Sequence, residues 1–213
     1  MTTATAPSAN TLPAGPTIDA MEFFRRSVGY WRSQRTTHHL PFRRSEIGES
    51  NIHVGILEAD DPRVIEICKL HKIDPALASG GANVTWKSLM AWDTENDNHD
   101  SASVMVIVPD TDNPFAGKLL RERGYAESDP VAGDYHMDAE DGLVLITDYE
   151  TMSSVERFWF TGDNMRMRTS TLKRFGGFNT ATFCTEVRLD APDHQPVKAQ
   201  AIAPDGPLSP LGW

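Results

Sequence analysis

The chain has 213 residues, a formal net charge of -10 at pH 7 and a sequence pI near 5.1. This length suffices for one domain with a substantial core, and an acidic chain without a basic stripe is a poor ligand for nucleic acid or anionic membranes. The start of the chain lacks a signal peptide's charged and apolar regions, and no window approaches the roughly 20 apolar residues of a membrane span. We expect the protein to stay in the compartment where it is made.

Both ends of the chain are rich in Ala, Thr, Pro and small polar residues and have no usable apolar period. Such segments bury too little apolar surface to offset the entropy of ordering them. We therefore predict disordered tails at residues 1–17 and 190–213. Residues 18–189 are left as one folded domain.

Two short helices are predicted in the first third of the chain. Asp19 is a suitable N-cap for a helix that places Met21, Phe24 and Val28 at helical spacing and stops at Gly29. The second helix lies within residues 60–74, where Pro62 suits the first turn. Its expected apolar stripe consists of Val64, Ile65, Cys68 and Leu70.

The rest of the domain reads as short strands separated by turn residues. Asp141-Gly142, Gly162-Asp163-Asn164 and Gly176-Gly177 stand where tight hairpins need residues that accept positive φ. Many short antiparallel strands favour a mainly β protein, a closed antiparallel up-and-down barrel that removes its own sheet edges. The nine expected strands cover residues 31–41, 50–59, 82–92, 101–109, 134–140, 142–151, 154–161, 165–174 and 178–189.

Alternation along three of these strands collects polar and aromatic side chains on one face. Side chains two apart in a strand share a face, so three groups form: Trp31, Ser33, Arg35, Thr37 and His39; Trp86, Ser88, Met90 and Trp92; and Arg166, Arg168 and Ser170. Facing inward, they would line a wet cavity suited to a flat, conjugated guest with carboxylates, since Arg binds carboxylates bidentately. Facing outward, they would be an ordinary solvated sheet face.

Gly29-x-Trp31 favours the inward alternative, because lipocalins begin their first strand in this way. In lipocalin-like barrels the tryptophan closes one end of the cavity, often beneath an arginine from a late strand. Arg188 is the candidate for that arginine.

Two longer stretches, WRSQRTTHHLPFRRSEIGES at 31–50 and ERFWFTGDNMRMRTST at 156–171, resemble the S-type phycobiliprotein lyases. The resemblance covers roughly residues 20–189. It implies a lipocalin-like barrel of about ten strands that binds a phycobilin, an open-chain tetrapyrrole such as phycocyanobilin or phycoerythrobilin. It also implies a client, the apo-subunit of phycocyanin, allophycocyanin or phycoerythrin, to whose cysteine the bilin is attached. The implied location is the cyanobacterial cytosol, and no cofactor is implied beyond the bilin substrate.

The resemblance also implies which residues bind the bilin. Arg35, Arg166 and Arg168 match bilin-binding positions, and we expect them at the propionates or the pyrrole oxygens. Ser170 is a further hydrogen-bond donor on the strand of the last two arginines.

Histidine and tryptophan complete this expected site. His38 and His39 match a histidine pair, but adjacent strand residues face opposite ways, so we expect His39 to touch the bilin and His38 to support it. Either Trp86 or Trp92 matches a tryptophan that stacks on the pigment.

The implied chemistry is addition of a client thiol to the exocyclic double bond of the bilin. The lyase then holds the bilin and supplies a proton to the ethylidene carbon. His39, Asp148, Glu150 and Glu156 are all candidates for that acid, and each carboxylate has an ordinary surface role as its alternative. Since the nucleophile belongs to the client, the two cysteines, Cys68 and Cys184, are expected to be reduced and packed.

Other readings remain open at this point. We expect no metal, since the histidines have no ligand spacing and the loop DTENDNHD at 93–100 lacks the glycine of an EF-hand. The run at 42–46 is either a docking surface for the client or an ordinary turn held by Arg-Glu pairing. The functional alternatives are a non-catalytic lipocalin-like carrier of bilin or fatty acid, a homodimeric lyase, and one subunit of a heterodimeric lyase.

Overall fold

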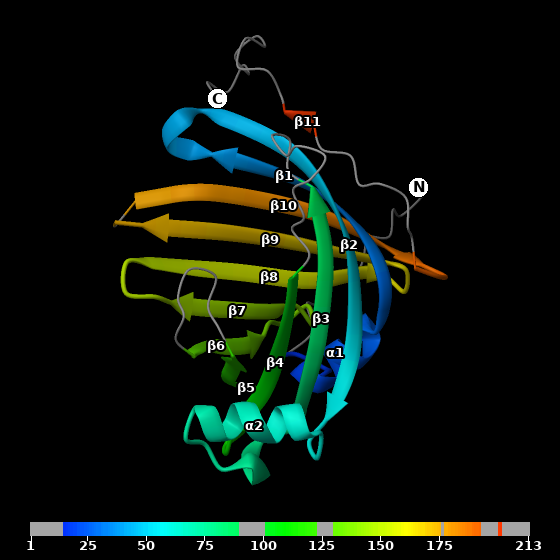
Figure 1. The fold of residues 1–213 in the computed structure, drawn as a ribbon, viewed down its shortest axis with the longest axis vertical. Coiled ribbons are helices and arrows are strands. Elements are labelled where there is room, and N and C mark those ends of the chain that lie inside the picture. The colour runs from blue at the N-terminus through cyan, green and yellow to red at the C-terminus, as the bar shows by residue number, and fades with distance from the viewer. Residues whose placement is uncertain (1–14, 90–100, 123–129, 176, 193–199, 202–213) are drawn as a thin grey trace, which may run out of the picture.

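The computed structural model describes residues 15–89, 101–122, 130–175, 177–192 and 200–201. Ten antiparallel strands follow one another around a barrel, and β1 pairs with both β2 and β10 to close it (Figure 1). The prediction of a mainly β, closed antiparallel up-and-down barrel is confirmed. The strands are β1 (Gly29–His39), β2 (Arg44–Glu58), β3 (Gly80–Leu89), β4 (Ser101–Asp110), β5 (Asn113–Arg121), β6 (Val131–Met137), β7 (Leu143–Asp148), β8 (Met152–Gly162), β9 (Met165–Arg174) and β10 (Gly177–Leu189).

Strand β5 is absent from the predicted set. Its sequence NPFAGKLLR contains a proline and a glycine, and Leu119 and Leu120 are both buried, one in the barrel interior and one beneath a helix on the outside. A strand covered on both faces loses the alternation that identifies a strand in a sequence. Gly117 is required here, since its φ is +157° and a Cβ would lie 2.2 Å from the carbonyl oxygen of Val108.

Helix α1 (Ala20–Ser27) closes one end of the barrel. Asp19 caps it as predicted, accepting a hydrogen bond from the Glu22 amide at 2.8 Å. Its apolar side chains, including Met21, Phe23 and Phe24, pack in one core cluster with Trp31 from β1. In Figure 1 the helix lies to the right, at the end where β2, β8 and β10 finish.

Helix α2 (Pro62–Leu70) packs on the outside of the barrel. Val64, Ile67 and Cys68 form a second core cluster with β4 and β5 side chains. The predicted stripe was therefore wrong in part: Ile67 takes the buried position, while Ile65 is half-buried and Leu70 is exposed. Short 3-10 helices follow β1 and α2, at η1 (Leu40–Phe42) and η2 (Pro75–Leu77).

The predicted tails fall largely outside the described residues. Within them, Thr17 donates to the Asp141 carboxylate, and Gln200–Ala201 forms a short strand, β11, against β2. Gln200 and Ala201 therefore take part in the sheet, and the disorder of the two tails stays a prediction. In the part of the chain that the structure describes, no helix is long and apolar enough to cross a membrane.

Candidate functional site

The barrel encloses a cavity of about 440 Å³. The α1 side chains Phe23, Phe24 and Ser27 form its floor, and the walls come from the inward positions of β1 to β5 and β7 to β10. Its lining is mixed: apolar and aromatic side chains stand beside serines and charged side chains. Such a cavity suits an amphipathic guest better than a fatty tail alone.

A chain of ion pairs crosses this cavity. Arg166 of β9 lies opposite Glu186 of β10, with Nη2 2.6 Å and Nε 2.7 Å from Glu186 Oε2. Arg168 lies between two carboxylates, with Nε 3.7 Å from Glu186 Oε1 and Nη1 3.6 Å from Glu156 Oε1. Arg121 reaches Glu156 from β5 at 3.9 Å. The register of β8, β9 and β10 aligns these side chains on one inner face.

The cavity lining carries more positive than negative charge. Arg35, Arg121, Arg166 and Arg168 line it together with two carboxylates, Glu156 and Glu186. Among the described residues of the lining, four cations against two anions leave a formal excess of two positive charges. Burying cations is costly unless anions compensate them, so this site is suited to a dianionic guest.

Arg35 owes its place in the cavity to a glycine on the neighbouring strand. Gly48 of β2 lies opposite Arg35 in the register, and a Cβ at this glycine would be 2.9 Å from Arg35 Nε. The absence of a side chain at position 48 therefore lets the guanidinium lie flat against the β2 backbone.

Aromatic rings lie among these charges. Trp86 and Phe158 line the cavity, and the guanidiniums of Arg168 and Arg166 stand 5.5 and 5.8 Å from the Phe158 ring centroid. Beneath them Trp31 is fully buried, between Arg166 at 4.8 Å and Arg188 at 4.2 Å. The lipocalin-type prediction of Trp31 beneath Arg188 is confirmed in this geometry.

Five of the residues singled out from the sequence line the cavity together: Arg35, Trp86, Glu156, Arg166 and Arg168. Ser170 lies on the same inner face, opposite Glu156 and Thr182, but outside the residues that line the cavity.

His39 lies at the end of the barrel opposite α1. It shares the inner face of β1 with Arg35, and its Nε2 is 3.6 Å from Glu46 Oε2 on β2. The Glu46 side chain is 11% exposed and that of His39 32%. This histidine and carboxylate form a pair above the cavity rather than in it.

The structure does not bring the other candidates into the cavity. His38 is exposed, because it faces away from the barrel as strand alternation requires. Asp148 is exposed at the end of β7, whose inward positions are Leu143, Leu145 and Thr147, and Glu150 is exposed on the following turn. Trp92 and the loop at 93–100 lie outside the described residues.

Two charged residues of the cavity lining escaped the sequence analysis. Arg121 lies on the unpredicted strand β5. Glu186 shares strand parity with Arg188, which was selected from the lipocalin motif, so alternation along the same strand could have found Glu186. Glu186 is therefore the partner carboxylate that the sequence reading lacked, since Glu156 was already a candidate.

Both cysteines are reduced and buried, as predicted. Burial raises the pKa of the Cys68 thiol, which is on the buried face of α2 and is not part of the cavity lining. Cys184 accepts from Arg168 Nη2 at 3.4 Å. Among the described residues, no group of three His, Cys, Asp or Glu side chains is arranged to hold a metal ion.

Comparison with known proteins finds the model of the CpeS-like protein family matching residues 19–189. The chain is 66% identical over 172 residues to a chromophore lyase CpcS/CpeS 2 of Trichodesmium erythraeum, covering 81% of this chain and 88% of that protein. It is 58% identical over 196 residues to a phycocyanobilin lyase subunit CpcS of Picosynechococcus, covering 92% and 98%. The S-type phycobiliprotein lyase CPES of Guillardia theta superposes with a TM-score of 0.71 at 33% identity, over 82% of this chain and 95% of that one.

Proposed function

The chain belongs to the CpeS-like family, and on that premise we propose that it is a chromophore lyase that binds a phycobilin and attaches it to a cysteine of a phycobiliprotein subunit. The observation that carries the proposal is the chain of ion pairs inside the barrel, beside aromatic rings and open space. A packed hydrophobic core has none of these features.

The charge of the cavity supports a phycobilin as the guest. An open-chain bilin carries two propionates, and the cavity lining has two positive charges in excess. A fatty acid carries one carboxylate and does not balance this excess. Arg35 and Arg121, on the β1 and β5 walls, are the proposed propionate ligands, because both guanidiniums line the cavity and a guanidinium binds a carboxylate through two parallel hydrogen bonds.

The carboxylates and rings support binding of the conjugated part. Pyrrole nitrogens donate hydrogen bonds, and Glu156, held between Arg121 and Arg168, is an acceptor that faces the cavity. Trp86 and Phe158 offer apolar surface for the tetrapyrrole plane. Arg168 fixes Glu156 and Glu186 in position for this role.

The reaction that follows is an addition. The client thiolate forms a carbon–sulfur bond with one carbon of the exocyclic double bond, and a proton is added to the other carbon, so no oxidant or further reactant is needed. His39 is the proposed proton donor, with Glu46 orienting its ring from 3.6 Å. It lies at the end of the barrel that α1 leaves free for a client.

The client and the assembly belong to the proposal as well. We expect an apo-phycobiliprotein subunit as the client, which requires the protein to meet newly made subunits in the cytosol. A relative is named a lyase subunit, so action as one half of a heterodimer is the alternative to action as a homodimer or alone.

Incubation with phycocyanobilin and the apo-phycocyanin β-subunit tests the proposal. Bilin absorbance and zinc-induced fluorescence are read on the denatured client, against a control without the protein. Covalent pigment above that control supports a lyase. Pigment that binds this protein but reaches no client, alone or with a related subunit, favours the carrier.

A further inference from the structure

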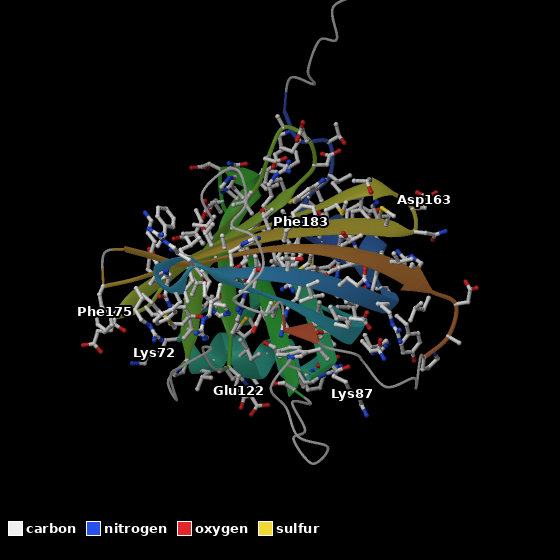
Figure 2. The ribbon with its side chains drawn as sticks, turned by 90° about the horizontal axis from the view of Figure 1, so that it is seen from above. Lys72, Lys87, Glu122, Asp163, Phe175 and Phe183 are labelled. Atoms are coloured by element: carbon white, nitrogen blue, oxygen red, sulfur yellow. The ribbon has the colours of Figure 1, made fainter. Side chains whose placement is uncertain are left out.

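Two hairpins at the end of the barrel opposite α1 expose phenylalanine side chains. Phe42, on the turn between β1 and β2, is 71% exposed, and Phe175, between β9 and β10, is 84% exposed. Phe178, at the start of β10, is 55% exposed. Phe175 and Phe42 are the most exposed large apolar residues in the described part of the chain. Figure 2 shows Phe175 at the tip of its hairpin, at the opposite end from Asp163.

The two hairpins lie side by side. β1 and β10 pair up to His39 and Thr180, and η1 contacts β10. In Figure 1 both hairpins lie to the left, away from α1. Together they form one surface, here called the tip patch, which consists of Phe42, Arg43, Arg44, Lys173, Phe175 and Phe178.

The tip patch is positively charged on an acidic protein. Arg43, Arg44 and Lys173 are all exposed, and no described carboxylate lies within ion-pair distance of any of them. Lys173 Nζ stands 4.7 Å from the centroid of Phe178. The Arg-Glu pairing that would make residues 42–46 an ordinary turn is absent, because Glu46 points inward to His39.

The backbone at both tips is strained. Arg43 has φ 49° and Phe175 has φ 51°, in the left-handed region that bulky residues rarely adopt. A glycine or asparagine would relieve this strain and remove the exposed ring or charge. Residues with strained backbone conformations cluster at functional sites, including ligand-binding ones.

We propose that the tip patch is the docking surface for the client, and that it binds an acidic protein surface with apolar pockets beside the reactive cysteine. The inference rests on the proposed function, because α1 and Trp31 close the other end and the client thiol has to reach the pigment from this one. The exposed charged side chains of the tip patch are cationic, so this patch attracts an acidic surface although the chain as a whole has a net charge of -10. A client protein is favoured over an anionic membrane because the proposed function requires a client cysteine to reach the pigment at this end of the barrel.

Direct binding of the apo-phycocyanin β-subunit tests the inference without requiring transfer. Binding is followed by fluorescence anisotropy of the labelled subunit with the wild type, with the double variant Phe42→Ser/Phe175→Ser and with Arg43→Glu/Arg44→Glu. Each double variant should raise the Kd for the subunit about tenfold. Added salt should weaken wild-type binding more than binding of the charge-reversed variant.

Matched controls lie on and after α2. Leu77→Ser removes a comparably exposed apolar residue, and Lys69→Glu/Lys72→Glu reverses two exposed charges; both should leave the Kd unchanged. Phycocyanobilin affinity, measured separately, should be unaltered in every variant. A wild type that does not bind the subunit, or tip variants that bind it as wild type does, would overturn the docking surface.

The same measurements separate this inference from the proposed function. If the tip variants still attach pigment with an unchanged KM for the subunit, the protein is a lyase and the docking surface is elsewhere. If the wild type binds bilin but attaches none, the lyase activity fails instead. Sedimentation with anionic phosphatidylglycerol vesicles is the remaining arm, and loss of vesicle binding without loss of subunit binding in the tip variants contradicts the client assignment.

Discussion

Arg166 and Glu186 form an ion pair inside the barrel in which both side chains are almost completely buried, with exposed fractions of 7% and 1%. Glu186 also faces Arg168, with 3.7 Å between its Oε1 and Arg168 Nε. This carboxylate is therefore the anion that allows two cations to remain in a low-dielectric interior. Its loss leaves those cations undercompensated.

Glu186→Gln keeps the shape of the side chain and removes its charge. We expect the free energy of unfolding to fall by about 3 kcal/mol, because a buried arginine loses its partner. Urea unfolding measures this. The control is Glu58→Gln, which breaks an exposed pair with Arg25 and should change the free energy by less than about 1 kcal/mol. Equal stability of the two variants contradicts the buried-pair interpretation.

Gly48→Ala tests whether the position of Arg35 matters for pigment binding. The added Cβ would lie 2.9 Å from Arg35 Nε, so the guanidinium has to move. We expect bilin affinity to fall about fivefold, or about 1 kcal/mol, as a charge-assisted hydrogen bond weakens. Bilin titration followed by absorbance checks this. Gly55→Ala is the control on the same strand. Its Cβ would be no nearer than 3.9 Å to any atom, so this variant should bind bilin as wild type does.

Arg188→Ala should loosen the closed end of the barrel. Arg188 donates to the carbonyls of Arg26 at 2.6 Å and Asp163 at 3.2 Å, and it covers Trp31. Burial, and next the nearby Arg166, lower the pKa of Arg188, yet arginine stays charged near neutral pH. We expect the free energy of unfolding, measured by thermal unfolding, to fall by about 2 kcal/mol, and the tryptophan fluorescence to shift. Arg188→Lys should recover only part of this lost stability, because an ammonium group cannot donate to both carbonyls at once.

The acid sensitivity of the fold should depend on Asp138. Burial raises the pKa of this carboxyl, but hydrogen bonds from Arg157 and from the amides of Gly142 and Glu140 outweigh it, so the net shift is downward from 3.8. A lowered pKa in the folded state means that the stabilisation is complete above pH 3.8 and is lost as the pH falls through the folded value.

Asp138→Asn removes this titration. Its urea midpoint should therefore fall less steeply than that of wild type below about pH 4. Asp112→Asn, on the exposed turn between β4 and β5, makes the same chemical change away from these hydrogen bonds and should follow the wild-type curve. Parallel curves for wild type and Asp138→Asn would rule out this role.

Tyr135→Phe should leave the fold as stable or make it more stable, by up to about 1 kcal/mol. Tyr135 is 2% exposed, and its hydroxyl has no hydrogen-bond partner among the described residues. Burial, with smaller contributions from Asp110 and Asp19, raises the pKa of this phenol, so it stays neutral. Thermal unfolding measures this difference in stability. A fall of more than about 1 kcal/mol in the free energy of unfolding would mean that the hydroxyl is hydrogen-bonded in solution.

The local chemistry of the chain was readable before its fold. Asp19 as a cap, the turn at Asp141, with φ 58°, and the pairing of Trp31 with Arg188 all follow from rules that act over a few residues or from a short motif. Strand alternation likewise put Arg166 and Arg168 on one face. These features depend on backbone geometry that each segment carries with it.

Only the closed barrel decided which side chains meet. Alternation relates residues within one strand, but it does not say which face points inward or which strand comes to lie alongside, so Glu186 as the partner of Arg166 and Arg121 as that of Glu156 were not predicted. The same limit applies to Asp148, which was a candidate proton donor in the sequence analysis but is exposed on the outside of the barrel. Register and closure set these distances, because an ion pair needs atoms from separate strands within 4 Å of each other.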